Sequence, residues 1–499
     1  MQSTFKVLVP LLLTGFGCAS GPQKLSSHDA VAMSQARPSA RQAVVSVVID
    51  GQDPDQGSPW AKGRPWRRRI NGLVVTGRRI LVHGRRLAHH TLIMVEKMGA
   101  SKRYEAELIE VDYELPLALL TVKDPAFWED LEPLEISDDV PSEGDVKICR
   151  WLDSGQFEEA RAVVKQLRVA DHFPGDVQLL TLEVSSPITA AGWGEIVLSG
   201  GEVVGITTSS SDDQLPVLAA PVLRQFLDHV ESGTYKGFAR HGFAWQRLSN
   251  PALRAQLGLQ ESEGGIRVRN VQSTGSAAGA LKPGDVLLEL GGYAIDERGK
   301  FEHTEYGKLY FGVLFTDGVA PGDTLEAKVL RGGERINVQL KLRAMPVHKD
   351  VVPRYVFDRA PEYLQVGGLV FQPLTADYMR MWRRWWENGP LRLLVEMHAK
   401  DSGPHQEGEQ LLILSRVLPD PVNLGYHDLR ALLVTRVNGK AVRSMADLAV
   451  ALASPQAGFH IVDFAPGQSA SRIVINATEA AQAGPRIQQR YGLAAPSAN

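Results

Sequence analysis

The sequence contains many side chains of types that carry out chemistry, among them 13 His and 57 Asp and Glu, but few of them have the necessary spacing. His89 and His90 are adjacent, and adjacent side chains in a strand point to opposite faces, so this pair would not share a metal ion. Cys149 ends the strand-like run 145–149, which predicts a buried and unreactive thiol. The sequence holds no other cluster with metal-ligand spacing, so we predict neither a metal nor a cofactor. Nucleophilic catalysis by a serine would in addition need a base and an orienting acid in mutual contact with it.

The elements that would position such residues are mostly short strands. Apolar runs separated by turn residues lie at 43–49, 72–75, 91–95, 117–122, 177–182, 195–198 and 203–206. This pattern predicts an all-β barrel or sandwich over residues 42–236. Residues 222–230 have apolar side chains at helical spacing and predict one helix that closes this region. Two further β-rich units follow at 237–345 and 346–478, and residues 479–499 are expected to form a frayed tail.

Length and composition narrow the class of protein. At roughly 150 residues per domain, 499 residues suggest about three domains. The chain has 54 basic and 57 acidic residues, so it lacks the strong positive field that attracts nucleic acid, and we predict no nucleic-acid partner. Two cysteines exclude a disulfide-stapled fold.

The first residues are typical of an export signal. Lys6 is followed by the short apolar run 7–13, and small residues then lead to Cys18. The end of this segment resembles a bacterial lipoprotein signal, which implies cleavage after residue 17, a lipid on Cys18 and a flexible tether over 18–41. Gly15 departs from the apolar residue usual at that position, so a cleaved secretory signal is the alternative. Either signal predicts an exported protein, periplasmic or anchored to the outer membrane through Cys18.

Two segments resemble the core signature of PDZ domains. The first is Lys-Pro-Gly-Asp-Val-Leu-Leu-Glu-Leu-Gly-Gly at 282–292, and the second is Val-Asn-Gly-Lys-Ala-Val at 437–442. A β domain followed by two PDZ domains resembles the HtrA/Deg family of serine proteases, most of all its long plant-type members. Further matches follow in the same order at 65–68, 77–81, 118–122, 245–254 and 423–426. The resemblance implies a mostly β chain with a trypsin-like double β-barrel at 42–236, a PDZ domain at 237–345 and a PDZ-like domain at 346–478. It also implies a possible homo-oligomer.

The positions that match the family's Ser-His-Asp triad carry other residues. The histidine position is Arg85, the aspartate position is Pro116 and the serine position is Gly192. A guanidinium stays protonated, proline has no carboxylate and glycine has no side chain, so none can replace the residue it matches. The resemblance therefore predicts a pseudoprotease that is not an enzyme.

A relocated triad is the alternative to this interpretation. His83 lies two residues before Arg85, Asp112 four before Pro116, and Ser185 and Ser186 seven and six before Gly192. Triad members must lie within about 3.2 Å of one another, and these displacements are unequal. If they nevertheless converge, the chain is an active serine endopeptidase of this family, acting in protein quality control of the cell envelope.

Two loops match the part of a PDZ domain that holds a terminal carboxylate. The loop of the first domain consists of His241, Gly242, Phe243 and Ala244, and that of the second consists of Gly367, Gly368, Leu369 and Val370. PDZ domains add a peptide strand to a sheet edge and hold its carboxylate with backbone N–H groups. The loops predict binding of unfolded or C-terminal peptide segments, as a chaperone, scaffold or protease regulator. For the second domain the alternative is a blocked groove.

Two basic and aromatic stretches allow more than one interpretation. Residues 60–69 could bind single-stranded nucleic acid or an anionic envelope polymer, or could be a solvated barrel face. Residues 378–386 could lie on a membrane surface, or form a helix that packs on the second PDZ domain.

Overall fold

The structure is a computed structural model, and it describes residues 39–97, 102–172, 176–188, 193–209, 214–402 and 408–493. The predicted export signal, Cys18, most of the tether and the predicted serine position Gly192 lie outside these ranges.

The first half of the chain begins with a seven-stranded antiparallel sheet in the order β5-β4-β1-β2-β3-β7-β6. Its strands are β1 (Val44–Pro54), β2 (Lys62–Val75), β3 (Arg79–His83), β4 (His90–Lys97), β5 (Tyr104–Glu105), β6 (Glu107–Asp112) and β7 (Leu117–Thr121). Alternate residues of β1, namely Val45, Val47 and Ile49, point into one core, as the two-residue period of a strand requires. The short helices α1 (Ala40–Ala43) and α2 (Pro125–Trp128) flank this sheet, and the 3₁₀ helix η1 (Gly84–Leu87) follows β3.

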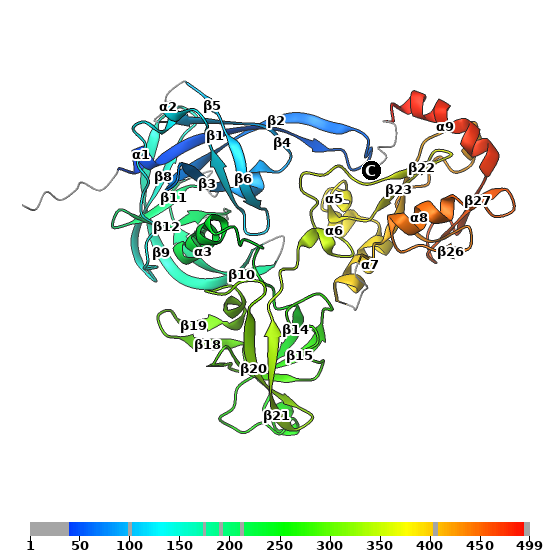
Figure 1. The fold of residues 1–499 in the computed structure, drawn as a ribbon. Coiled ribbons are helices and arrows are strands. Elements are labelled where there is room, and N and C mark those ends of the chain that lie inside the picture. Colours follow the sequence, from blue (N-terminus) through cyan, green and yellow to red (C-terminus); the bar gives the residue numbers. More distant parts are fainter. Residues whose placement is uncertain are drawn as a thin grey trace, which may run out of the picture. The chain divides into compact units, whose positions relative to one another are not determined.

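A closed six-stranded barrel follows, in the order β10-β13-β12-β11-β8-β9. Its strands are β8 (Gly144–Trp151), β9 (Phe157–His172), β10 (Val177–Ser185), β11 (Ile196–Ser199), β12 (Glu202–Thr207) and β13 (Gln214–Ala219). The predicted closing helix is confirmed as α3 (Ala220–Glu231), which buries Val222, Leu223 and Phe226. Figure 1 shows these strands in cyan to blue-green, with α3 in green. Cys149 is buried on β8, and burial raises the pKa of its thiol to about 12.

The next domain is a sheet in the order β14-β15-β16-β20-β21, with two short hairpin pieces. Its elements are β14 (Phe243–Arg247), α4 (Pro251–Gln256), β15 (Ile266–Val271), β16 (Val286–Leu290), β17 (Tyr293–Ala294), β18 (Lys300–His303), β19 (Gly307–Tyr310), η2 (Phe311–Phe315), β20 (Thr324–Arg331) and β21 (Glu334–Lys341). Asp285 stabilises the turn of the 282–292 signature. It is buried and accepts two hydrogen bonds from Arg331, at 2.7 and 2.9 Å. Its carboxylate also accepts one from the Lys282 N–H at 2.8 Å.

The last domain is a sheet in the order β22-β23-β24-β25-β27-β28, crossed by several helices. Its elements, after η3 (Val347–Lys349), are β22 (Leu364–Val366), β23 (Leu369–Pro373), α5 (Ala376–Met379), α6 (Trp385–Asn388), α7 (Leu391–Ser402), β24 (Leu412–Val417), η4 (Pro421–Asn423), β25 (Leu432–Val437), β26 (Lys440–Ala441), α8 (Met445–Leu452), β27 (Phe459–Phe464), β28 (Arg472–Asn476) and α9 (Ala477–Tyr491). Figure 1 draws α8 in orange and α9 in red in this domain.

Two expectations for this domain differ from the structure. Residues 378–386 do not form one helix, because α5 ends at Met379 and Arg384 has a positive φ of 53° directly before α6. Within this stretch Tyr378 is buried and Trp386 is exposed. The expected frayed tail is helical through Tyr491, because Ala480, Ala483 and Ile487 recur at helical spacing and are buried.

The predicted fold class is confirmed: the chain is mostly β, with barrel-type sheets first and two further β domains after them. Among the residues described here, no helix is both long and apolar enough to cross a bilayer.

Candidate functional site

The fold brings together two of the three positions that match the family's triad. Strands β3 and β7 pair with His83 opposite Leu117, so η1 begins beside the residue that precedes β7. The Gly84 N–H donates to the Pro116 carbonyl at 2.8 Å. A Cβ at Gly84 would lie 2.4 Å from the Leu117 carbonyl oxygen, so only glycine allows this approach. The residue before Arg85 is thus hydrogen-bonded to Pro116, so the two matched positions lie on adjoining segments.

His83 is buried and is held in the neutral form. Its Nε2 lies 3.1 Å from the Thr208 carbonyl oxygen, which can only accept, so Nε2 carries the hydrogen. Burial and the nearby Arg85 guanidinium lower the pKa of His83 to about 3. The ring contacts Trp193 edge to face at 5.6 Å, and Nδ1 has no hydrogen-bond partner in the part of the chain that the structure describes.

The residues of the alternative triad do not meet. Asp112 accepts hydrogen bonds from the Glu114 and Leu115 N–H groups, at 2.7 and 2.8 Å, and another from the Tyr235 hydroxyl. Ser185 lies on β10, paired with neighbouring strands on both sides. Ser186 accepts from the Ile188 N–H at 3.2 Å. Among the described residues, His83 has no hydrogen bond to any of these side chains.

A buried carboxylate, Glu195, lies close to the end of the loop that contains the predicted serine position, and no local pattern in the sequence marks it as functional. Glu195 is 4% exposed and accepts hydrogen bonds from the Trp193 N–H at 2.9 Å and from the Thr207 hydroxyl. The Gly194 and Glu195 N–H groups reach the Thr207 hydroxyl oxygen at 3.2 and 3.0 Å. These contacts fix the backbone beside His83, since a Cβ at Gly194 would lie 3.3 Å from the His83 Cβ.

Several basic side chains of residues 60–69 interact with acidic or aromatic side chains of the same sheet. Arg67 forms an ion pair with Asp50 at 2.7 Å, and Arg69 forms one with Glu96 at 2.6 Å. The Arg68 guanidinium lies 3.8 Å from the centre of the Trp66 ring. These are the contacts expected of a solvated barrel face.

The first predicted PDZ loop lies at an open sheet edge. His241 to Ala244 lead into β14, which is the edge strand of its sheet and pairs with β15 on one side. Gly242 has a φ of 70°, and a Cβ there would lie 2.5 Å from the Gly275 Cα, so this turn requires glycine. Burial and the charge of Arg240 lower the pKa of His241 to about 4, and its Nδ1 accepts from the Phe243 N–H at 3.2 Å.

Aromatic side chains and a hollow flank this loop. Phe243 stacks on Phe311 of η2, with ring centres 5.7 Å apart, and Trp245 meets the same ring edge to face. Beside the loop is a hollow of about 210 Å³, lined by Asp176, Arg240, His241, Gly242, Phe243, Ala244, Arg269, Asn270 and Gln272. The two guanidinium groups make this hollow suited to an anionic group such as a terminal carboxylate.

The second predicted PDZ loop forms a tight hairpin. Gly367 and Gly368 connect β22 to β23, and Val366 pairs with Leu369. Their φ angles of 52° and 86° fit a type I′ turn, in which both central residues need a positive φ. Because β24 pairs with the other edge of β23, both edges of this strand are occupied. A Gly-Gly between two apolar runs is a hairpin signal, so the sequence could have predicted β22.

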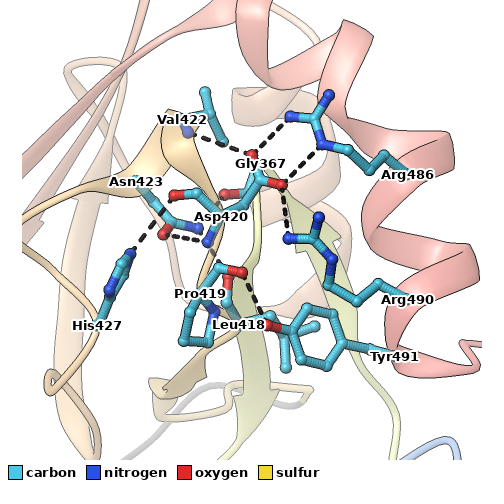
Figure 2. Close-up of polar contacts among 10 residues, drawn as sticks. All are labelled: Gly367, Leu418, Pro419, Asp420, Val422, Asn423, His427, Arg486, Arg490 and Tyr491. Atoms are coloured by element: carbon cyan, nitrogen blue, oxygen red, sulfur yellow. Dashed lines mark hydrogen bonds and ion pairs between the residues drawn. The ribbon is translucent and has the colours of Figure 1, made fainter.

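A buried aspartate, Asp420, binds the C-terminal helix α9 to the rest of the last domain (Figure 2). The Asp420 carboxylate is fully buried and accepts two hydrogen bonds from Arg486, at 2.7 and 2.9 Å. Arg490 lies 3.5 Å from the same carboxylate, and the Tyr491 hydroxyl donates to the Pro419 carbonyl at 2.7 Å. Hydrogen bonds from Arg486 lower the pKa of Asp420 despite its burial.

Two of the β domains match a family model described as "PDZ domain", over residues 256–342 and 352–499. Putative protease Do-like 3, mitochondrial, of Arabidopsis thaliana is 27% identical over 415 residues, which cover 82% of this chain and 71% of that protein. Protease Do-like 2, chloroplastic, of the same plant is 29% identical, over 82% of this chain and 67% of its own length. This chain has two PDZ domains and is homologous to the Deg/HtrA proteases.

Part of the chain is also similar to solved structures. The HtrA-type protease AlgW with decapeptide is 18% identical and covers 62% of this chain and 97% of its own, with a TM-score of 0.46. We name residues 237–345 the first PDZ domain and 346–493 the second, with the C-terminal helix included in the latter. Among the described residues, no group of three or more His, Cys, Asp and Glu is placed to hold a metal ion.

Proposed function

We propose that this chain is an exported Deg/HtrA-like pseudoprotease that binds unfolded or C-terminal peptide segments through its PDZ domains. It acts as a chaperone, a scaffold or a regulator of active proteases. The observation that carries the loss of peptidase activity is the pairing of η1 with the residue before β7. It brings Gly84, the residue before Arg85, against Pro116, and by the resemblance Arg85 and Pro116 match the family's base and its orienting acid.

The environment of His83 supports the same conclusion. A general base must accept the proton of the nucleophile, but Nε2 of His83 donates to the Thr208 carbonyl. Its lowered pKa also makes the imidazole a weak base. Losing a triad as a unit costs about 10⁶ in kcat in a model serine protease, so residual activity from the surrounding backbone would be small.

We expect the chain from Ala19 onward to leave fluorescent casein intact and to remain unlabelled by a fluorophosphonate serine probe. An active Do-like protease, treated in parallel, is the positive control. Labelling together with cleavage, both abolished by Ser185→Ala or Ser186→Ala, would contradict the proposal and would show that this chain is an active serine endopeptidase.

Peptide binding is assigned first to the first PDZ domain, because β14 has an open edge and the hollow beside its loop contains two arginines. We expect Arg269→Gln to weaken the binding of peptides with a free C-terminal carboxylate by roughly tenfold, since a charged hydrogen bond contributes about 1.5 kcal/mol. Fluorescence anisotropy with free-acid and amidated peptides measures this difference.

Arg247→Gln is the matched control, because Arg247 is an exposed arginine at the end of β14 that is farther from the loop. Equal effects of the two substitutions would show that net charge, and not the hollow beside the loop, determines binding.

A further inference from the structure

Strand β22 occupies the sheet edge at which the second PDZ domain would take a peptide. If the loop before β23 holds a terminal carboxylate, a peptide lying along β23 must run antiparallel to it and end beside Leu369. β22 runs antiparallel to β23, and its last residue, Val366, pairs with Leu369. Val366 therefore lies where the terminal side chain of a bound peptide would lie.

The surroundings of β22 are those of a bound peptide strand. Leu364 and Val366 pack against the core of this domain, which includes Leu369 of β23 and Leu448 of α8. Both α8 and α9 contact β22. The Gly367 carbonyl, which takes the place of a terminal carboxylate, accepts a hydrogen bond from the Asn423 side-chain amide at 2.8 Å.

We propose that residues 364–366 are a tethered substitute for a C-terminal peptide. The second PDZ domain then binds free peptides with an aliphatic terminal residue, of the Leu-x-Val kind, when this strand is displaced. The inference rests on the peptide binding proposed above.

The C-terminal helix keeps the substitute strand in place. A Cβ at Gly367 would lie 3.0 Å from the Ala480 Cβ, so the first half of α9 lies directly against the turn. The second half is tied to Asp420 by Arg486 and Arg490. Weakening these ion pairs loosens α9, and with it the cover over the turn.

The test uses a fluorescent peptide with the sequence of residues 361–366 and a free C-terminal carboxylate, added to the chain from Ala19 onward. We expect the double variant Arg486→Gln with Arg490→Gln to bind it at least tenfold more tightly than the unsubstituted chain, and to lose this gain with the amidated peptide. Arg472→Gln is the matched control, because it removes the Arg472–Asp463 pair between β27 and β28 of the same domain. It should leave peptide affinity unchanged.

A second variant does not depend on α9. Leu364→Ser with Val366→Ser removes the apolar side chains that pack β22 against the core, and it leaves both α9 and the loop 367–370 unsubstituted. Circular dichroism and hydrogen exchange in β27 and β28 show whether each variant is folded. Bound peptide should slow exchange in α8.

Equal binding by the unsubstituted chain and the variants would overturn the proposal, because the groove would then be open. Faster exchange of the β22 amides without a gain in binding, in both folded variants, would overturn the ligand assignment. Slowed exchange only in β14 would assign the peptide to the first PDZ domain. That result would overturn this inference and leave the proposed function standing, whereas no binding at either strand would count against both.

Discussion

Lowering the pH from about 7 to about 4.5 is expected to destabilise the chain by several kcal/mol, through three buried histidines. Burial lowers the pKa of His83 to about 3, and lowers those of His172 and His241 to about 4, from an ordinary value of 6.5. Each also lies near an arginine whose charge opposes protonation: Arg85 for His83 and His172, and Arg240 for His241.

The direction of this change in stability follows from which state of the chain, folded or unfolded, binds protons first as the pH falls. The unfolded chain protonates these histidines near pH 6.5, whereas the folded chain resists until about pH 4 or below. Their contribution to stability is therefore complete above pH 6.5 and is lost as the pH falls toward 4, by up to about 1.4 kcal/mol per histidine and pH unit.

Urea unfolding at a series of pH values measures this slope. His172→Gln should reduce this slope by the contribution of about one proton, because it removes one of the three buried histidines. His172 lies inside the barrel, with its Nε2 2.9 Å from the Thr181 hydroxyl. His398→Gln, at an exposed position of α7, is the control and should leave the slope unchanged. A free energy of unfolding that stays constant between about pH 6.5 and 4.5 would contradict the prediction.

Asp420→Ala is expected to give the largest loss of stability in the second PDZ domain, on the order of 2 kcal/mol. The substitution removes the cap of η4, where Asp420 accepts from the Val422 N–H at 3.2 Å, and frees both arginines of α9. Because Arg486 and Arg490 are each 49% exposed, water recovers part of their lost interaction, which keeps the effect below that of a fully buried pair.

Urea unfolding monitored by hydrogen exchange in α9 and β28 reports on this domain. Asp463→Ala is the matched control, because Asp463 pairs with Arg472 at the exposed end of the same sheet and should cost less than about 0.5 kcal/mol. Similar losses of unfolding free energy for the two substitutions would show that the buried pairing of Asp420 with Arg486 and Arg490 contributes no more than an exposed ion pair.

Local patterns in the sequence predicted much of the fold. The apolar run at 117–122 became β7, whose alternate residues enter two different cores. The apolar side chains at helical spacing in 222–230 became part of α3. The 282–292 signature predicted a turn and a strand, and Asp285 with Arg331 shows why those residue types are needed there.

Contacts between residues distant in the sequence could not be predicted in this way. Nothing near Asp420 indicates that its partners lie in a helix about 66 residues later, since that pairing depends on the whole domain being folded. Glu195 and Thr207 lie only 12 residues apart, across the β11–β12 pair, but nothing in that segment indicates that the carboxylate is buried. The triad positions were predicted by resemblance, and only the pairing of β3 with β7 brings the segments of Arg85 and Pro116 together.

In the arrangement proposed for residues 364–366, the two-glycine turn between β22 and β23 determines which ligands can displace the tethered strand. A strand tethered by so short a connection is present at its site at an effective concentration of at least the millimolar order. A peptide of micromolar affinity, free in solution at ordinary concentration, therefore displaces little of it. A polypeptide already held elsewhere on the same molecule has a comparable local concentration and can compete. The tether thus makes this domain respond to substrates that have been captured, and not to every free C-terminus that it meets.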